Sequence, residues 1–345
     1  MKKSFALGLF ACVLGLLAGC GGVKKETLHL YTWADYVSPD MVAQFEKDNN
    51  CTVVIDTFDS NEAVYAKLKA GATGYDLITP TNYMVAIMAK QGMLQKLDHT
   101  KIPNIANLDP TYNKFVSDPT NTYSVPYMFG SAGIAYRKDL VMNFEPTYAM
   151  FDRADLKGKM VMLDDMRETI GMALKYLGFS LNTTDDAQLA QAGDVVIRWK
   201  KNLAKFDNEQ YKNGIASGEF SVAVGYSGDV RQVMAEQKDV GYVAAKEGIP
   251  LQVDEFVIPM GAPNAELAHK YIDFMHRADV AAANMNFVYY LCPNKPAYDK
   301  LSPEFKADPT VFLPADVLAK SESIVDLGDL NKKYSDLWDK IKAAQ

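Results

Sequence analysis

Short apolar runs alternate with amphipathic runs along the chain from residue 28 onwards. Three runs are rich in Val, Ile and Leu and have the length of β-strands: residues 28–31, 51–57 and 76–80. Runs with helical spacing of apolar side chains begin at Ser38, Asn61 and Asn82. Pro39 suits the first position of a helix, and Gly71 and Gly92 suit helix ends. This alternation predicts an α/β protein with a mostly parallel sheet.

A second series of strand and helix patterns follows residue 126. Its strand-like runs cover residues 131–136, 159–163, 220–226 and 252–259. Its helical patterns cover residues 173–177, 185–206, 230–236, 266–275, 280–287 and 330–344. Two extended segments, residues 126–137 and 254–259, are expected to connect the two series. The pattern therefore predicts two lobes around a cleft that closes by hinge motion.

We expect each lobe to combine two stretches of the chain. The first lobe would comprise residues 27–130 plus 256–310, and the second lobe residues 131–255 plus 311–345. At 345 residues the chain is long enough for two lobes, each with its own core.

The N-terminal stretch is predicted to be a leader and a tether. Lys2 and Lys3 precede an apolar run over residues 5–17, which is too short for a comfortable membrane span. The run ends in Leu17-Ala18-Gly19-Cys20, which resembles the lipobox of bacterial lipoproteins. We expect a signal peptide over residues 1–19, lipid attachment at Cys20 and a tether over residues 20–26. A plain secretory signal cut near Ala18 is the alternative.

This leader predicts an exported protein, periplasmic or on the cell surface. It would meet the membrane only through the lipid anchor, because no later run is long and apolar enough to cross a bilayer. Cys51 and Cys292 remain after the leader, and they could form a disulfide or be two small buried side chains.

The composition is that of a soluble globular protein, with 48% hydrophobic and 23% charged residues. The formal net charge is −7 for the whole chain, and loss of Lys2 and Lys3 with the leader makes it −9. An acidic balance argues against nucleic-acid binding, which needs Lys and Arg patches. It is compatible with a cationic ligand but does not demonstrate one.

Aromatic and acidic residues recur together at the ends of predicted strands. Trp33-Ala34-Asp35-Tyr36 follows the first strand directly, where open α/β sheets place their ligands. An ammonium group needs oxygen acceptors, and the methylene chain of a polyamine needs flat apolar walls that also supply cation–π attraction. The candidate rings are Trp33, Tyr36, Tyr83, Tyr226 and Tyr290, and the candidate acids are Asp35, Asp165, Glu168, Asp229 and Asp254.

Each candidate has a structural alternative. The first two rings could pack on a lobe surface, and Asp35 could be a turn or cap residue. Asp165, Glu168 and Asp229 could be acids at helix N-termini. Asp254 differs, because it interrupts an apolar strand in which an unpaired acid is disfavoured.

The chain resembles the bacterial spermidine/putrescine-binding proteins, which are the extracellular receptors of polyamine ABC importers. The resemblance runs from about Leu28 to the C-terminus. The matching stretches include Tyr31 to Tyr36, Ser60 to Lys69, Tyr75 to Leu77, Gly92 to Asp98, Ser124 to Tyr127, Asp164 to Glu168, Met172 to Leu174, and Lys246 to Gly248.

The resemblance implies a two-lobed periplasmic-binding-protein fold of type II, with a polyamine in the cleft. It implies that Trp33, Asp35 and Tyr36 clamp the ligand, and that the other candidates match family positions. It further implies a monomer that delivers its ligand to membrane permease subunits, with no enzymatic activity and no cofactor.

Three positions depart from the family pattern. Tyr226 stands where Trp is usual, Gln252 where an aromatic residue is usual, and Ile324 where the spermidine-binding branch has Gln. The stretch around Asp229 looks more like the putrescine-binding branch. The choice between putrescine and spermidine therefore leans towards putrescine and stays open.

Other functions have less support in the sequence. The four histidines, His29, His99, His269 and His276, are dispersed and show no metal-ligand spacing. No Gly-rich phosphate loop or nucleophile elbow indicates an enzyme. Tyr289-Tyr290 is similar to paired tyrosines that bind ferric iron in other proteins of this fold, and a sensing subunit without transport is a further alternative.

Overall fold

The computed structural model describes residues 25–344. Ten strands form one mixed sheet whose main order is β2-β1-β3-β9-β4-β7-β5-β6, with β10 beside β9 and β8 beside β4. The strands are β1 (Glu26–Trp33), β2 (Cys51–Phe58), β3 (Leu77–Ile78), β4 (Ser124–Arg137), β5 (Met160–Met162), β6 (Leu203–Phe206), β7 (Val222–Tyr226), β8 (Val240–Val243), β9 (Pro250–Val257) and β10 (Glu322–Ser323).

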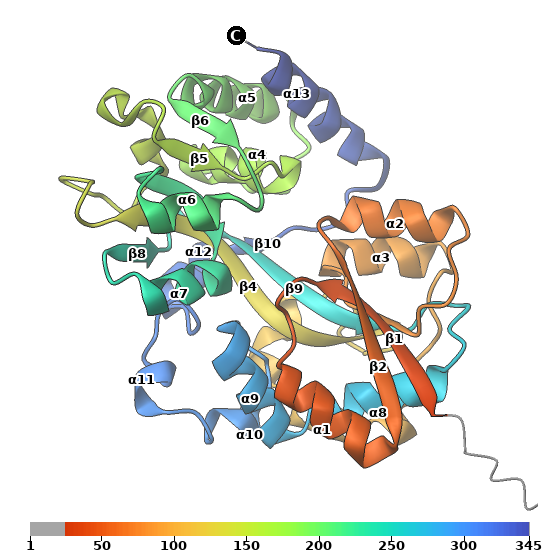
Figure 1. Cartoon of the computed structure of the whole chain (residues 1–345). Helices are drawn as coiled ribbons and strands as arrows, with labels where there is room; N and C mark the ends of the chain where they lie inside the picture. Colours follow the sequence, from red (N-terminus) through yellow and green to blue (C-terminus); the bar gives the residue numbers. More distant parts are fainter. Residues whose placement is uncertain (1–24, 345) are drawn as a thin grey trace, which may run out of the picture.

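Helices cover this sheet in two groups, one around β1 and β2 and the other around β5 and β7 (Figure 1). The helices are α1 (Pro39–Asn49), α2 (Asn61–Lys69), α3 (Asn82–Lys90), α4 (Met166–Tyr176), α5 (Asp186–Lys200), α6 (Tyr211–Ser217), α7 (Ser227–Glu236), α8 (Ala265–Met275), α9 (Ala278–Val288), α10 (Lys295–Tyr298), α11 (Pro303–Lys306), α12 (Ala315–Lys320) and α13 (Asn331–Ala343).

The long strand β4 belongs to both groups. Its residues 124–131 pair antiparallel with β9, and its residues 132–136 pair antiparallel with β7. Strands β1, β2 and β3 pair parallel on one side, and β5, β6 and β7 pair parallel on the other. The expected two-lobed α/β fold is therefore present, with β4 and β9 at its centre (Figure 1). The exact lobe boundaries given above stay a prediction.

Alternation along β1 buries the strand on both of its faces. Leu28 and Leu30 belong to the large core cluster that contains Phe45 of α1, while Tyr31 belongs to a second cluster with Ile78. Successive strand residues point to opposite faces, so one strand supplies two cores. Each fully buried Leu or Phe stabilises the fold by roughly 1.5–3 kcal/mol.

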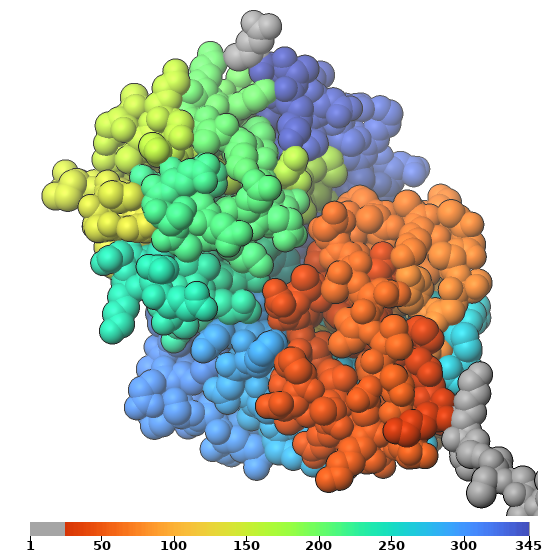
Figure 2. Space-filling view, viewed as in Figure 1, coloured from red at the N-terminus to blue at the C-terminus, as the bar shows by residue number. Residues whose placement is uncertain are grey.

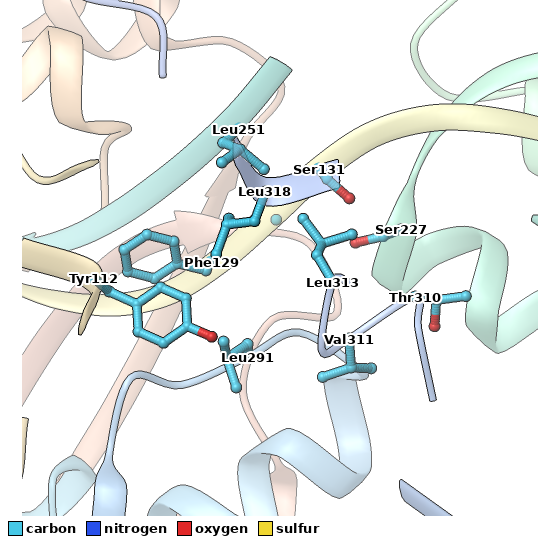
Figure 3. Close-up of a pocket in the computed structure, with 11 residues that line it drawn as sticks. Tyr112, Phe129, Ser131, Ser227, Leu251, Leu291, Thr310, Val311, Leu313 and Leu318 are labelled. Atoms are coloured by element: carbon cyan, nitrogen blue, oxygen red, sulfur yellow. The ribbon is translucent and has the colours of Figure 1, made fainter. Parts of the chain in front are cut away.

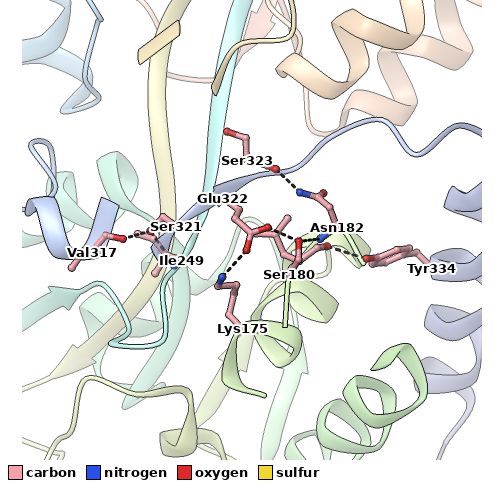
Figure 4. A network of polar contacts seen from close by, with 10 residues as sticks. Lys175, Ser180, Asn182, Ile249, Val317, Ser321, Glu322, Ser323 and Tyr334 are labelled. Atoms are coloured by element: carbon pink, nitrogen blue, oxygen red, sulfur yellow. Dashed lines mark hydrogen bonds and ion pairs between the residues drawn. The ribbon is translucent and has the colours of Figure 1, made fainter. Parts of the chain in front are cut away.

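The segment that contains β10 returns to the centre of the sheet, where β10 pairs with β9. Glu322 of β10 accepts hydrogen bonds from Lys175 Nζ at 2.7 Å and from Ser180 Oγ at 2.5 Å. The side-chain amide of Asn182 donates to the carbonyl of Ser323 at 2.8 Å (Figure 4). This network fixes the segment to the group of strands and helices that contains α4.

The predicted elements are recovered with one correction. The helix predicted over residues 185–206 ends at Lys200, and residues 203–206 instead form β6, parallel to β5. Leu203 and Phe206 continue the apolar spacing of the helix, but pairing with β5 satisfies their backbone groups in an extended form. The strand predicted over residues 131–136 is longer, because it starts at Ser124.

Two further expectations concern cysteines and membranes. Within the described residues Cys51 and Cys292 are both free and buried, so they are core residues and not a disulfide. No helix in this part of the chain combines the length and apolar character of a bilayer span. The predicted signal peptide, Cys20 and most of the tether lie outside the described residues.

Candidate ligand-binding site

Asp254 is the centre of one half of the candidate site. It lies in β9, and its two carboxylate oxygens accept the hydroxyls of Tyr36 at 2.5 Å and Thr81 at 2.7 Å. Burial raises the pKa of Asp254 to about 6, against the lowering effect of these hydrogen bonds. Trp33 lies beside this carboxyl, and its buried indole N–H adds to the lowering of the pKa.

Glu168 is the centre of the other half. Asp165 caps α4 by accepting the backbone N–H of Glu168 at 3.0 Å, which places the Glu168 side chain in the first turn. That side chain is only 2% exposed, and its Oε1 accepts a hydrogen bond from the side-chain amide of Gln252. Its Oε2 is buried and has no partner in the described part of the chain.

The two acids of α4 have raised pKa values. Burial raises the pKa of Glu168 to about 8, and the nearby carboxyl of Asp165 adds to the shift. Burial also raises the pKa of Asp165 to about 6. Both groups are therefore easier to protonate than in water, and a bound cation would favour their charged forms.

Tyr290 connects the two halves. Its ring centroid lies 5.5 Å from that of Tyr36, and its hydroxyl lies 3.4 Å from Asp229 Oδ1. Gly130 and Gly228 make room for this ring, because an added Cβ would lie 2.9 Å and 2.2 Å from its atoms. Tyr290 is thus held tightly between β4 and the start of α7.

Asp229 is the most fully paired of the candidate acids. Its Oδ2 accepts the hydroxyl of Tyr211 at 2.9 Å and lies 3.6 Å from Lys212 Nζ. A ligand amine at Asp229 would have to share this carboxylate with Lys212. Asp229 nevertheless lies next to Tyr290.

Tyr226 and Tyr83 face the acids of α4 from two directions. The pKa of Tyr226, at the end of β7, is raised by burial and then by Asp165 and Glu168. Tyr83 of α3 donates to Glu62 at 3.0 Å, and its pKa is raised by burial and then by Glu62 and Asp165. The sheet therefore brings residues from both groups of elements to the same acids.

Asp35 is a predicted site residue that the structure does not bring into contact with the other candidate acids. It lies in the turn after β1 with φ 54° and an exposed side chain. A turn residue is the alternative that the sequence already offered, since Asp tolerates the left-handed region. Its role in ligand binding stays a prediction.

Several partners of the site escaped the sequence interpretation. They are Glu62, Thr81, Tyr211 and Gln252. The useful signal for Gln252 was its position two residues before Asp254, which places both side chains on one face of β9. The other three carry no local signal, because they approach the site through long-range packing.

The buried acids of the site make no salt bridges among the described residues, although the positive charge of Arg167 partly opposes the burial that raises the pKa of Asp165 and Glu168. In residues 25–344 no salt bridge involves Asp165, Glu168 or Asp254. Buried carboxylates without a cation are costly, so a cationic ligand would stabilise them. The described residues contain no group of three or more His, Cys, Asp or Glu side chains that could hold a metal ion. An organic cation fits this site best.

Two hollows lie elsewhere along the described residues. A small cavity behind β4 and β9 is lined by Phe129, Ser131 and Leu251, among other mostly apolar side chains (Figure 3). A groove of about 660 Å³ runs beside Tyr83 and Ser323. Neither hollow is lined by Asp165, Glu168 or Asp254. Figure 2 shows the surface hollowed where the red and orange part of the chain meets the green part.

The iron alternative finds little geometric support at the paired tyrosines. Tyr289 adopts φ 58° and stacks its ring on Phe305, with the guanidinium of Arg231 4.9 Å from its centroid. Tyr290 instead faces Tyr36 and Asp229. The two phenols therefore have different surroundings and are not arranged as a pair.

Comparisons with known proteins give one family model and several full-length relatives. Residues 40–313 match the family model described as bacterial extracellular solute-binding protein. The chain is 34% identical to the putrescine-binding periplasmic protein PotF of Escherichia coli, covering 100% of this chain and 99% of that protein. It is 35% identical to the spermidine/putrescine-binding periplasmic protein of Escherichia coli, and the match covers 100% of this chain and 100% of that protein.

Solved structures show the same relationship. A putative spermidine/putrescine ABC transporter from Listeria monocytogenes superposes with a TM-score of 0.87 and 34% identity, over 93% of this chain and 100% of that chain. The substrate-binding protein PotD from Streptococcus pneumoniae gives a TM-score of 0.83 and 31% identity, over 92% of this chain and 99% of that chain.

Proposed function

Since the chain belongs to the bacterial extracellular solute-binding proteins, we propose that it captures a linear polyamine and delivers it to an ABC importer. Putrescine and spermidine are the ligands that its relatives' names give. The observation that carries the proposal is the set of buried acids, Asp165, Glu168 and Asp254, that have no salt-bridge partners among the described residues and lie next to tyrosine rings.

One ammonium group of the ligand binds at Asp254. The hydroxyls of Tyr36 and Thr81 orient the carboxylate and leave room for a further donor on each oxygen. A desolvated ammonium–carboxylate pair is strong only when both groups are well partnered, and these two hydroxyls supply the partners.

A second amine binds at Glu168 and Asp165. Two carboxyls near each other keep some of their charge neutralised by protons until a cation arrives. The rings of Tyr226, Tyr290 and Trp33 enclose the methylene chain and contribute cation–π attraction of roughly 0.5–2 kcal/mol. Lobe closure would bring the residues of α4 and of β1 onto the same ligand.

The protein acts as a receptor and not as an enzyme in this proposal. The acids hold a cation, and no nucleophile with an adjacent base is needed. Export, lipid attachment at Cys20, a monomeric state and docking on permease subunits belong to the same proposal. The relatives' description as periplasmic proteins supports export, and the leader pattern supports export and lipid attachment.

Isothermal calorimetry with putrescine, spermidine and spermine tests the proposal. We expect binding at micromolar concentration or tighter, about −8 kcal/mol or stronger. Arginine, glucose and ferric citrate are the comparison ligands. No heat and no thermal stabilisation with any of the three polyamines would overturn the proposal, and selective binding of ferric citrate would replace it.

A further inference from the structure

Gln252 occupies the strand position between the two halves of the site. It lies in β9 two residues before Asp254, and its side chain is half-buried. Its amide Nε2 donates to Oε1 of Glu168 on α4. Its amide oxygen lies above Gly130, where an added Cβ would be 3.3 Å away. The amide is therefore confined between β4 and α4.

This contact leaves the two oxygens of Glu168 unequal. Oε1 is occupied by the amide, whereas Oε2 is buried and has no partner within residues 25–344. Glu168 is only 2% exposed, so water does not replace the missing donor easily. A buried acceptor of this kind fits an ammonium donor.

The spacing along β9 matches a short diamine. Side chains two residues apart in a strand share a face and lie about 7 Å apart. The side chains of Asp254 and Gln252 are therefore at about that spacing, and the carboxyl of Glu168 is in contact with the Gln252 amide. This spacing is similar to the separation of two ammonium groups on an extended four-carbon chain.

We propose that Gln252 is a positioning residue for the second amine: it holds Glu168 so that Oε2 receives the amine, and it presents its own amide oxygen as a further acceptor. The inference rests on the proposed function and goes beyond it, because it names the group that sets the second amine site. A phenylalanine side chain at this position would offer a wall but no donor to Glu168.

The charge state of Glu168 gives the proposal a specific signature. Burial and Asp165 raise the pKa of Glu168, while the hydrogen bond from Gln252 lowers it. Removal of the amide should therefore raise the pKa further, so that a higher pH is needed for the charged form. The other ionisable groups that face Glu168 are Arg167 of the same helix, Tyr226, Tyr242 and Tyr148.

Gln252→Met is the central variant, because Met is nearly the same size and has no amide. Gln188→Met is the matched control: Gln188 is a half-buried glutamine on α5 whose side-chain oxygen accepts the hydroxyl of Thr183 at 2.6 Å. The folded state of each variant is checked by circular dichroism and thermal unfolding without ligand. Putrescine affinity is then measured by calorimetry from pH 6 to pH 9.

We expect Gln252→Met to weaken putrescine binding about 10-fold at pH 7, the size of one hydrogen bond to a charged group. The midpoint of the pH dependence should move to higher pH, and Gln188→Met should change neither quantity. In a Glu168→Gln background, Gln252→Met should cause a smaller further loss, because the amide then has no carboxylate to position and contributes only its own oxygen as an acceptor.

Three results would overturn the inference. They are unchanged affinity and pH profile in Gln252→Met, the same loss with and without the Glu168 carboxylate, and equal effects of the two glutamine variants. In each of these the wild-type protein still binds putrescine, so the proposed function would stand. Absence of polyamine binding by the wild-type protein would overturn both.

Discussion

Tyr36 and Asp254 are 218 positions apart in the sequence, and the Tyr36 hydroxyl lies 2.5 Å from Asp254 Oδ2. Tyr36 follows β1, whereas Asp254 lies in the central strand β9. Their contact joins the turn that directly follows Trp33 of β1 to the centre of the sheet. It therefore links residues 33–36 to Asp254, the acid that interrupts an apolar strand.

Asp254→Asn should weaken polyamine binding more than changes at the exposed acids. The variant keeps the shape of the side chain but removes the charge that pairs with an ammonium. Loss of one partner in a desolvated charge pair costs roughly 2–5 kcal/mol. Calorimetry with putrescine measures the loss, and Asp56→Asn on the exposed strand β2 is the control. Equal affinity in a folded Asp254→Asn protein would contradict this role.

Asp229→Ser should distinguish ligands by length. Asp229 lies beside Tyr290 and is already shared with Tyr211 and Lys212. We expect putrescine to lose more affinity than spermidine, by about tenfold or 1.4 kcal/mol. The control is Asp186→Ser, another acid in a first helical turn that pairs with a lysine, at 2.7 Å. Equal losses for both ligands would show that Asp229 does not select ligand length.

The ligand-free protein should become less stable as the pH rises from about 5 to 8.5 through the contribution of Glu168. Its pKa is raised in the folded state to about 8, so the folded state binds a proton that the unfolded state has released. This stabilisation is complete below pH ~4, near the unfolded pKa, and is lost as the pH rises through the folded pKa. A tenfold difference in proton affinity between the folded and unfolded states corresponds to about 1.4 kcal/mol.

Chemical denaturation at several pH values measures this effect. The free energy of unfolding of Glu168→Gln should depend less on pH than that of the wild-type protein, by about 2 kcal/mol or more across this range. Saturating putrescine should also reduce the pH dependence of the free energy of unfolding of the wild-type protein, because the cation stabilises the charged carboxylate. A wild-type curve parallel to that of Glu168→Gln would contradict the assignment.

Trp33 should report ligand binding by its fluorescence. It is partly buried beside Phe58, at 4.4 Å between ring centroids, and lies close to Asp254. Trp199 is fully buried in the packing of α5, and Trp338 lies on α13. Trp33→Phe should therefore abolish most of the ligand-induced change. A signal that persists in this variant would place the ligand away from the ring.

Gly228→Ala should disturb the site through Tyr290. An added Cβ would lie 2.2 Å from the Tyr290 ring, so the ring or the start of α7 must move. Overpacking of this kind costs roughly 1–3 kcal/mol of stability. Binding should weaken as well, because Tyr290 lies between Tyr36 and Asp229. Gly261→Ala is the control, since a Cβ there meets no atom within 4 Å among the described residues.

The sequence allowed the local part of the site to be predicted. Asp254 stood out because a carboxylate in an apolar strand requires a special partner, and the structure supplies Tyr36 and Thr81. The cap at Asp165 followed from the preference of acids for helix N-termini, and its side chain does cap α4. The sequence signals for both acids come from neighbours within a few positions, although the partners of Asp254 are distant in the sequence.

The remaining features depend on contacts that no local pattern encodes. Gln252 looked like a missing aromatic residue, and only the packing of α4 against β9 shows that it holds Glu168. The strand β6 was merged into a helix, since Leu203 and Phe206 fit either periodicity until β5 provides a partner. Long-range pairing decides between such alternatives.

Because strands β4 and β9 run through the centre of the sheet, the two lobes are expected to evolve together and not as separate domains. A break within β4 would remove the partner of β9 and the partner of β7 at the same time. Neither lobe could then be exchanged between proteins by a single recombination point, because each lobe draws on several stretches of the chain. The cleft is therefore expected to change by individual substitutions, such as the glutamine at position 252, while the frame that carries it passes on whole.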